Sequence, residues 1–281
     1  MNNKRHLIAL DLDGTLLTKD KEITPFTKNV LARAIDEGHI VVIATGRSDI
    51  MSLYYYNFLQ LNTPMINYNG AYIHHPRKRS WSLLTRHSVP KKTALQIVEV
   101  CYELDSKNLW IESGNQIILD QHDPEIIAAF EMMHRENTKL PLSIGQVREH
   151  IKEDPTSLIV HPNEEKITDL QTHLTNEFSE VVDHRIWGSR WSLMEISKKG
   201  LSKAYGIDKL ANYYNIPRDQ IIAFGDEDND LEMIDYAGIG VAMENGIDEL
   251  KAIADHITLT NEADGVATFL ADYLNIKETV G

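Results

Sequence analysis

Residues 7–16 of this 281-residue chain read LIALDLDGTL. The four apolar residues 7–10 predict a short buried strand, and Asp11 and Asp13, followed by Gly14, predict a loop at its carboxyl end. In parallel α/β sheets, ligands bind at that end of the strands. Two carboxylates this close repel each other unless a proton or a cation lies between them, and magnesium suits because it binds carboxylate and phosphate oxygens together. A solvated turn after a strand is the alternative interpretation.

Apolar strands and helices alternate in the first and last parts of the chain. A helix over 25–37 precedes a second buried strand over 40–44, and the alternation resumes near the C-terminus with strands at 221–224, 239–243 and 256–259. Each strand is almost continuously apolar, which is typical of a parallel sheet covered by helices on both faces. We therefore expect an α/β protein with a Rossmann-like parallel-sheet core.

The middle of the chain shows a different pattern. Short strands, separated in part by helices, are expected at 80–89, 108–112, 116–120, 157–161 and 181–196. Neighbouring strands joined by tight connections, such as residues 113–115, indicate antiparallel pairing. We therefore expect residues 82–190 to form an inserted α+β domain, and residues 1–81 and 191–281 to form the core that carries it.

Composition excludes several classes of partner. The formal net charge of −14 repels nucleic acid and anionic membranes. A phosphate site must therefore supply its own positive field, from a cation, basic side chains or helix N-termini. No apolar run approaches about 20 residues, and the short polar N-terminus does not fit a signal peptide. The expected location is the cytoplasm.

Two further segments could supply this positive field. Thr45-Gly46-Arg47 follows the second strand, and its hydroxyl and backbone N–H groups suit a phosphate oxygen, although Thr45 can equally cap the next helix. Lys203 lies at the expected start of a helix, where a cation opposes the helix dipole. Such a local violation is typical of a functional residue, but exposed lysines are common and the neighbouring sequence is rich in them.

The strand expected at 221–224 is followed by a dense group of acids. Four acids occupy the five positions 226–230, interrupted only by Asn229. Such a cluster needs a cation to be stable in a folded protein, because its charges repel one another. A plain acidic turn or helix cap is the alternative.

In this order the segments resemble the haloacid dehalogenase superfamily of phosphohydrolases, over the whole chain. The resemblance rests on Asp-x-Asp-Gly-Thr-Leu at 11–16, Thr-Gly-Arg at 45–47, Lys203 and Gly-Asp-x-x-Asn-Asp at 225–230. The insertion, the Asn-Gly-Ala sequence at 69–71 and the segment 261–266 are similar to the Cof-type branch, which comprises phosphatases with an α/β cap. The resemblance implies a magnesium-dependent phosphatase that hydrolyses a small phosphorylated metabolite through an aspartyl-phosphate intermediate.

The resemblance also implies roles for individual residues. Asp11 corresponds to the nucleophile and a magnesium ligand, and Asp13 to the general acid–base, whose backbone carbonyl also binds the metal. Asp226 corresponds to the third protein ligand of magnesium. The residues expected to bind phosphate or support the site are Thr45, Gly46, Arg47, Lys203, Asn229 and, behind them, Asp230. These roles are chemically consistent, because a carboxylate can attack phosphorus while a second one protonates the leaving group.

Two other functions stay open. A sugar phosphomutase of the same superfamily needs the same pair of aspartates and differs in keeping water from the phospho-enzyme. A binding or regulatory protein that has lost catalysis is the second, although it would usually lack one of Asp11, Asp13, Lys203 or Asp226. A dehalogenase is disfavoured, because that chemistry needs neither a paired Asp13 nor a metal.

The substrate stays open among sugar phosphates, flavin mononucleotide and pyridoxal phosphate. Specificity in a capped enzyme should come from cap residues. Candidates are Arg185, Trp187, Arg190 and Trp191, although aromatic residues in strands more often serve sheet packing. The expected partner is a small phosphate ester, with no nucleic acid and no membrane, and the oligomeric state is open.

Overall fold

The computed structural model describes residues 4–113, 116–135, 139–186 and 192–276. The chain divides into two compact units, Met1–Leu84 with Ser202–Gly281, and Thr85–Leu201. The second boundary between the units lies at 201/202, beyond the boundary expected at 190/191. The reason is that β11 (Met194–Lys198) pairs antiparallel with β10 (Val182–Ile186) and β9 (Ser157–His161), so it belongs to the sheet of the second unit.

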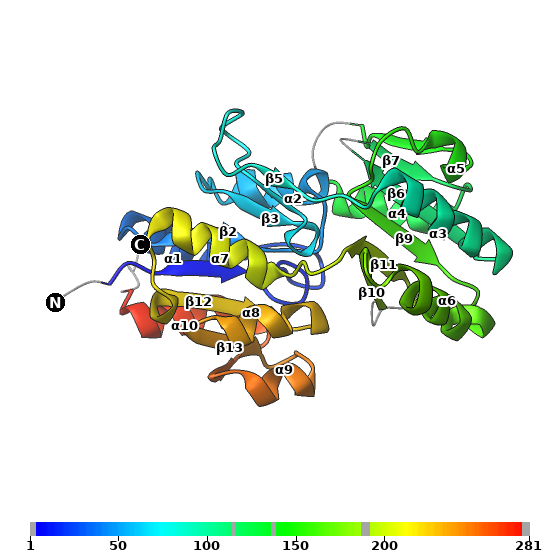
Figure 1. Cartoon of the computed structure of the whole chain (residues 1–281). Coiled ribbons are helices and arrows are strands. Elements are labelled where there is room, and N and C mark those ends of the chain that lie inside the picture. The colour runs from blue at the N-terminus through cyan, green and yellow to red at the C-terminus, as the bar shows by residue number, and fades with distance from the viewer. Residues whose placement is uncertain (1–3, 114–115, 136–138, 187–191, 277–281) are drawn as a thin grey trace. The chain divides into compact units, whose positions relative to one another are not determined.

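The first unit is built on a five-stranded parallel sheet with the strand order β14-β13-β12-β1-β2 (Figure 1). Its strands are β1 (Leu7–Leu10), β2 (Ile40–Ile43), β12 (Ile221–Gly225), β13 (Ile239–Met243) and β14 (His256–Thr258). Leu10, at the end of β1, lies opposite Ile43 of β2 and Phe224 of β12. The loops after these three strands therefore leave the same edge of the sheet, and the expected parallel-sheet core is confirmed.

Helices cover both faces of this sheet, because successive side chains of a strand point to opposite faces. Ile8 and Leu10 pack in one cluster with residues of α1 (Pro25–Asp36), α2 (Asp49–Phe58) and α10 (Gly265–Leu274). Leu7 and Ala9 pack in another with residues of α7 (Lys203–Tyr214), α8 (Leu231–Tyr236) and α9 (Asp248–Ile253). All four residues of β1 are fully buried. The strand that precedes the first acidic segment is thus buried between helices on both faces of the sheet.

A short antiparallel pair follows α2. β3 (Met65–Asn67) forms a parallel bridge between Ile66 and Ala44, just beyond the end of β2, and pairs antiparallel with β4 (Tyr72–His74). The tight turn η1 (Tyr68–Gly70) connects them. The strand expected over 80–89 is wrong in its length, since only β5 (Thr85–Arg86) is extended and paired there.

The second unit contains a six-stranded sheet with the order β10-β11-β9-β6-β7-β8. Its remaining strands are β6 (Asn108–Ser113), β7 (Gln116–Leu119) and β8 (Leu142–Ile144), and its helices are α3 (Lys91–Glu103), α4 (Pro124–Met133), α5 (Val147–His150) and α6 (Ile167–His173). β6 pairs antiparallel with β7 and β9, as expected for neighbouring short strands, whereas β7 and β8 are parallel. Buried residues of α3 and α6 pack on one face of the sheet.

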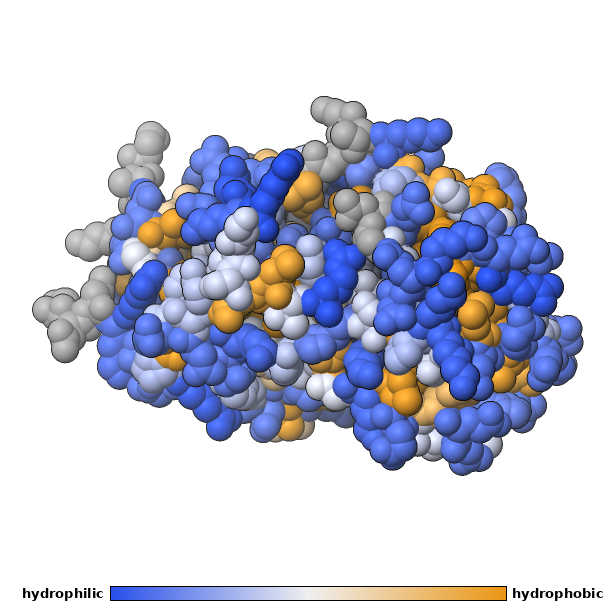
Figure 2. All heavy atoms as spheres, turned by 45° about the horizontal axis from the view of Figure 1, so that its top comes forward, coloured by the Kyte–Doolittle hydropathy of each residue, from blue (hydrophilic) through white to orange (hydrophobic). Residues whose placement is uncertain are grey.

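The remaining helical segments are single turns. They are η2 (Glu164–Lys166), η3 (Leu174–Phe178), η4 (Arg218–Gln220), η5 (Asp228–Asp230) and η6 (Asn261–Ala263). Hydrophilic residues cover most of the face shown in Figure 2, and hydrophobic residues occur there in small groups. Among the described helices, none has both the length and the apolar character that crossing a bilayer requires.

Candidate active site

Three of the four sequence segments meet at the carboxyl edge of the parallel sheet. Asp11 directly follows β1, Thr45 follows β2, and Asp226 directly follows β12. The N–H of Asp11 donates to the carbonyl of Phe224 at 3.2 Å, which extends the strand pairing up to the first acid. Because β1 lies between the other two strands, these side chains gather where ligands bind in such sheets.

Lys203 is the first residue of α7, and its side chain is fully buried. Its Nζ lies 2.6 Å from Oδ1 of Asp11 and 2.6 Å from Oδ1 of Asp230. Burial lowers the pKa of Lys203, but the charges of the two aspartates outweigh burial and raise this pKa above its ordinary value. The lysine at an unfavourable helix position is therefore a permanent cation between two carboxylates.

Asp230 supports the site through both of its oxygens. While Oδ1 accepts from Lys203, Oδ2 accepts from the N–H groups of Asp226 at 2.9 Å and Glu227 at 3.2 Å. These bonds shape the turn η5 after β12, so the end of the strand is fixed by the acid that closes the motif. Asp230 therefore binds both the lysine and the backbone that follows β12.

Asp226 faces the loop that follows Asp11. Its Oδ1 accepts a hydrogen bond from the hydroxyl of Thr15 at 2.8 Å. Gly14 has a φ of 77°, and a Cβ on it would lie 2.0 Å from Oδ2 of Asp226. Glycine at this position therefore serves two purposes: it adopts the left-handed backbone, and it leaves room for the Asp226 carboxylate.

Three buried carboxylates form a candidate metal centre. Oxygens of Asp11, Asp226 and Asp230 all lie within 4.8 Å of one another. Burial raises the pKa of Asp11, and Asp230 adds to this while Lys203 opposes it. Burial and the nearby charge of Asp11 likewise raise the pKa of Asp226. A group of oxygen donors whose charges repel one another fits a hard divalent cation, which would replace the shared protons.

Asp13 has different neighbours. Its carboxylate accepts from Arg47 Nε at 2.6 Å and Nη2 at 2.7 Å, and from Lys21 Nζ at 2.6 Å. Burial raises the pKa of Asp13, but these two cations outweigh burial and hold the pKa well below its usual range. The guanidinium of Arg47, which we expected at phosphate, is therefore bound to Asp13. The Asp13 carboxylate lies outside the acid cluster, whereas the metal contact expected of Asp13 is through its backbone carbonyl.

The remaining residues expected at phosphate lie close together. The hydroxyl oxygen of Thr45 accepts from the N–H of Arg47 at 3.2 Å, which leaves the hydroxyl hydrogen available to a ligand. Asn229 donates through Nδ2 to Oδ1 of Asn69 at 3.0 Å. A Cβ on Gly46 would lie 3.2 Å from Nδ2 of Asn69, so Gly46 gives the amide pair its space.

Sequence reasoning assigned no role to three of these residues. Thr15 lies within the first motif, and its hydroxyl gave a signal that could have been used. Asn69 stands before a glycine, which predicts a turn but not a bond to Asn229 at a separation of 160 residues. Nothing in the sequence around Lys21 predicted its ion pair with Asp13, because only the fold of the loop between them brings the two side chains together.

The candidates for specificity belong to the second unit. Arg185 lies on β10 and is half-buried. Trp187, Arg190 and Trp191 lie outside the described residues.

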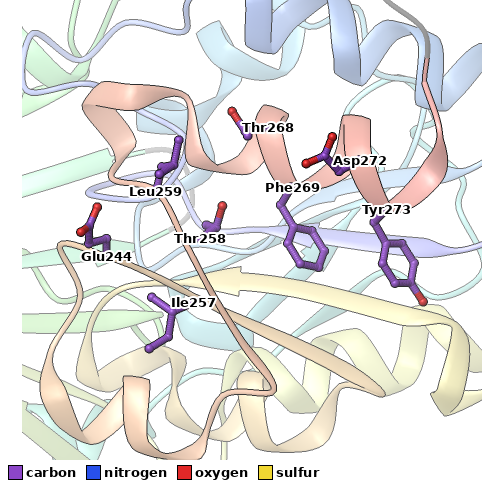
Figure 3. Close-up of a pocket in the computed structure, with 8 residues that line it drawn as sticks. All are labelled: Glu244, Ile257, Thr258, Leu259, Thr268, Phe269, Asp272 and Tyr273. Carbon is purple, nitrogen blue, oxygen red and sulfur yellow. The ribbon is translucent and has the colours of Figure 1, made fainter.

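A hollow of about 630 Å³ beside the edge strand β14 is lined by none of the residues described above (Figure 3). Its lining residues come from β14, α10 and the segments beside them, namely Glu244, Ile257, Thr258, Leu259, Thr268, Phe269, Asp272 and Tyr273. The ionisable groups Glu244 and Asp272 are acidic, and the lining contains no lysine or arginine. A phosphate ester would be repelled there, so the hollow is not the candidate active site.

Comparisons with known proteins point in one direction. The sequence model of the haloacid dehalogenase-like hydrolases matches residues 8–270. The 5-amino-6-(5-phospho-D-ribitylamino)uracil phosphatase YitU of Bacillus subtilis (strain 168) is 44% identical over 98% of this chain and 100% of that protein. YwtE of the same organism, a phosphatase named for the same substrate, is 30% identical over 95% of this chain and 98% of that protein. A crystal structure of a haloacid dehalogenase-like hydrolase from Bacteroides thetaiotaomicron matches with a TM-score of 0.84 and 26% identity, covering 96% of this chain and 100% of that one.

Proposed function

The chain belongs to the haloacid dehalogenase-like hydrolase family, and from this membership we propose that it is a magnesium-dependent phosphatase with Asp11 as its nucleophile. The observation that carries the proposal is the ion pair between buried Lys203 and Asp11 at 2.6 Å. The lysine binds Oδ1 of Asp11, which leaves Oδ2 as the attacking oxygen. Its charge also offsets the repulsion between this carboxylate and an incoming phosphate dianion.

The metal would be held by the carboxylates of Asp11 and Asp226, with the backbone carbonyl of Asp13 as a further ligand. Asp230 is part of the same cluster, but its oxygens are occupied by Lys203 and two backbone N–H groups, so we propose that it supports the ligands instead. When bound, magnesium would neutralise charge between the acids and the phosphoryl group. The buried oxygen-only cluster supports this choice of ion.

The proposed reaction has two steps. Oδ2 of Asp11 forms a bond to phosphorus while the ester P–O bond breaks, and Asp13 gives its proton to the departing alkoxide oxygen. Water then attacks the aspartyl phosphate, its proton passes to Asp13, and the bond to Asp11 breaks to release inorganic phosphate. The hydroxyl of Thr45 and the amide of Asn229 would bind phosphoryl oxygens. For the first step Asp13 must leave Arg47 and Lys21, since a carboxylate held by two cations keeps no proton to give.

We propose 5-amino-6-(5-phospho-D-ribitylamino)uracil as the substrate, because two relatives named for it match almost the whole chain. Sugar phosphates, flavin mononucleotide and pyridoxal phosphate are the competing esters. We further propose that the second unit supplies substrate specificity, with Arg185 as its described candidate residue. The partner is thus a small phosphate ester.

The test is phosphate release from a panel of these esters by the purified protein with magnesium. We expect the highest kcat/KM for the ribitylaminouracil phosphate, and no turnover by Asp11→Asn, whose neutral amide cannot attack phosphorus. An isomerised sugar phosphate without free phosphate would instead identify a phosphomutase. Undiminished turnover by pure Asp11→Asn would refute the assignment of the nucleophile.

A further inference from the structure

The turn between β3 and β4 has an unusual backbone. Tyr68, Asn69 and Gly70 have φ values of 49°, 51° and 99°. A positive φ is uncommon for a residue with a side chain and rarer still for a bulky one such as tyrosine. Such conformations persist only where the surrounding structure stabilises them, and they cluster at functional sites. The contacts that stabilise this turn therefore bear on function.

Backbone contacts join the turn to two segments of the candidate active site. The N–H of Asn69 donates to the carbonyl of Thr45, and the N–H of Tyr68 donates to the carbonyl of Arg47, each at 3.1 Å. Both ends of the Thr45–Arg47 segment are thus held by the turn. On the other side, a Cβ on Gly70 would lie 2.3 Å from the carbonyl oxygen of Ser202, the residue before Lys203. The turn is therefore packed closely against the start of α7.

The side chain of Asn69 adds a third connection. Its Oδ1 accepts from Nδ2 of Asn229 at 3.0 Å, and its amide lies against Gly46. The bond uses one hydrogen of the Asn229 amide and leaves the second for a ligand oxygen. It also fixes which way the Asn229 amide faces, since an amide without this acceptor could rotate.

The left-handed backbone alone does not explain why position 69 is an asparagine. Glycine and asparagine are the residues that adopt a left-handed backbone most readily, and glycine does so at the lower cost. The chain has glycine at Gly70, where any side chain would collide with Ser202. At Asn69 the backbone alone would also favour glycine, so the side chain has a purpose other than the turn.

We propose that Asn69 is a positioning residue of the phosphate-binding site, acting through the amide of Asn229 and the backbone of Thr45. The inference rests on the proposed phosphatase function and adds a residue to its machinery. Asn69 orients the two groups that bind phosphoryl oxygens before any ligand arrives. Because such groups act by their exact placement relative to the phosphoryl oxygens, a loss of orientation should weaken phosphate binding and slow turnover together.

The experiment compares Asn69→Gly and Asn69→Ala with the full-length wild-type protein. Both variants remove the side-chain acceptor, but their effects on the turn are opposite, since glycine relaxes the left-handed backbone and alanine strains it. We expect Asn69→Gly to keep or raise the wild-type Tm and Asn69→Ala to lower it. Both should nevertheless weaken binding of inorganic phosphate to the magnesium-loaded protein, by roughly fivefold or more, and lower kcat/KM by about tenfold to 100-fold.

The matched control is Asn215→Gly. Asn215 has a φ of 53° at the end of α7, so the substitution relaxes the same backbone conformation away from the site. It should leave phosphate affinity and turnover unchanged. A second readout is the double variant Asn69→Gly/Asn229→Ala. Asn69→Gly keeps the backbone contact to Thr45 and removes the acceptor of Asn229. Adding it to Asn229→Ala should therefore change kcat/KM by no more than about twofold.

Two results would overturn the inference. One is phosphate affinity and turnover that follow stability, with Asn69→Gly equal to wild type and only Asn69→Ala impaired. The other is an additive effect of the Asn69 and Asn229 substitutions. Failure of the proposed function would give a different result. A wild-type protein that binds inorganic phosphate but hydrolyses no ester would refute the phosphatase activity. The phosphate affinities of the variants would still decide the role of Asn69. A wild-type protein that binds no phosphate would overturn both.

Discussion

Replacing Lys203 by methionine would remove the cation on which the candidate site depends. The ammonium lies 2.6 Å from both Asp11 and Asp230, and none of these three side chains is appreciably exposed. Removing one partner of a buried ion pair typically costs about 3–5 kcal/mol, because the other charge is left buried and unpaired. We expect Lys203→Met to lose about this much unfolding free energy at neutral pH without metal.

The unfolding free energy lost by Lys203→Met should depend on pH, and the direction follows from the pKa values of the neighbouring aspartates. Burial and the charge of Asp230 raise the pKa of both Asp11 and Asp226 in the folded protein, and losing the lysine, which lowers both, raises these pKa values further. Between the ordinary aspartate pKa of about 4 and the raised values, the folded state binds more protons than the unfolded state, so stability falls as pH rises. The variant should therefore be closest to wild type under acidic conditions and furthest from it above the raised pKa values.

Urea denaturation with chelator present, at about pH 5 and about pH 8, measures both effects. The control is Lys251→Met, which removes the exposed ion pair to Asp248 at 3.0 Å and should cost no more than about 1 kcal/mol. Turnover by Lys203→Met should fall by at least about 100-fold, as on loss of a group that stabilises transition-state charge. A loss of stability as small as that of the control, or one that is equal at both pH values, would refute the reasoning.

Three further outcomes can be measured. Gly14→Ala should abolish magnesium-dependent turnover, because its Cβ would lie 2.0 Å from Oδ2 of Asp226; an active variant would show that the loop can shift without harm. Magnesium binding should release protons, since the raised pKa values of Asp11 and Asp226 leave protons to displace; calorimetry in two buffers of different ionisation enthalpy measures this, and a heat independent of buffer would contradict it. Replacing residues 85–201 by a short flexible linker should abolish discrimination among natural esters while slow cleavage of an activated aryl phosphate persists; an unchanged substrate ranking would show that specificity lies in the first unit.

The sequence predicted those parts of the site that depend on strand ends. An apolar strand followed by Asp11 or Asp226 places an acid at the carboxyl edge of a parallel sheet, whatever the details of the loops. Lys203 was a candidate because a cation at a helix start opposes the helix dipole, although an ordinary exposed lysine was the alternative. In their order along the chain these segments resemble the haloacid dehalogenase superfamily, and together they indicate one function.

The parts that could not be predicted depend on how loops fold back. Arg47 was expected at phosphate, but its guanidinium binds Asp13, and no local pattern states which of several nearby anions an arginine will bind. The same holds for the bond between Asn69 and Asn229. The sequence predicts that the second unit ends before β11, whereas the structure includes β11 in it. The residues of β11 do not state which strands it pairs with, and its partners β9 and β10 lie in the second unit.

The strand order of the first unit has a consequence for the synthesis of the chain. β1 is made first, yet one of its two neighbours, β12, begins only at Ile221. Asp11 and Asp230 both bind Lys203, so this ion-pair network cannot assemble until Asp230 has left the ribosome. The second unit, by contrast, is one continuous segment that can fold while the ribosome is still adding the rest. Because completing the parallel sheet means closing a loop of some two hundred residues, we expect the second unit to fold before the first. A chain released from the ribosome before β12 is made therefore contains Asp11 and Asp13 but neither Asp226 nor Asp230.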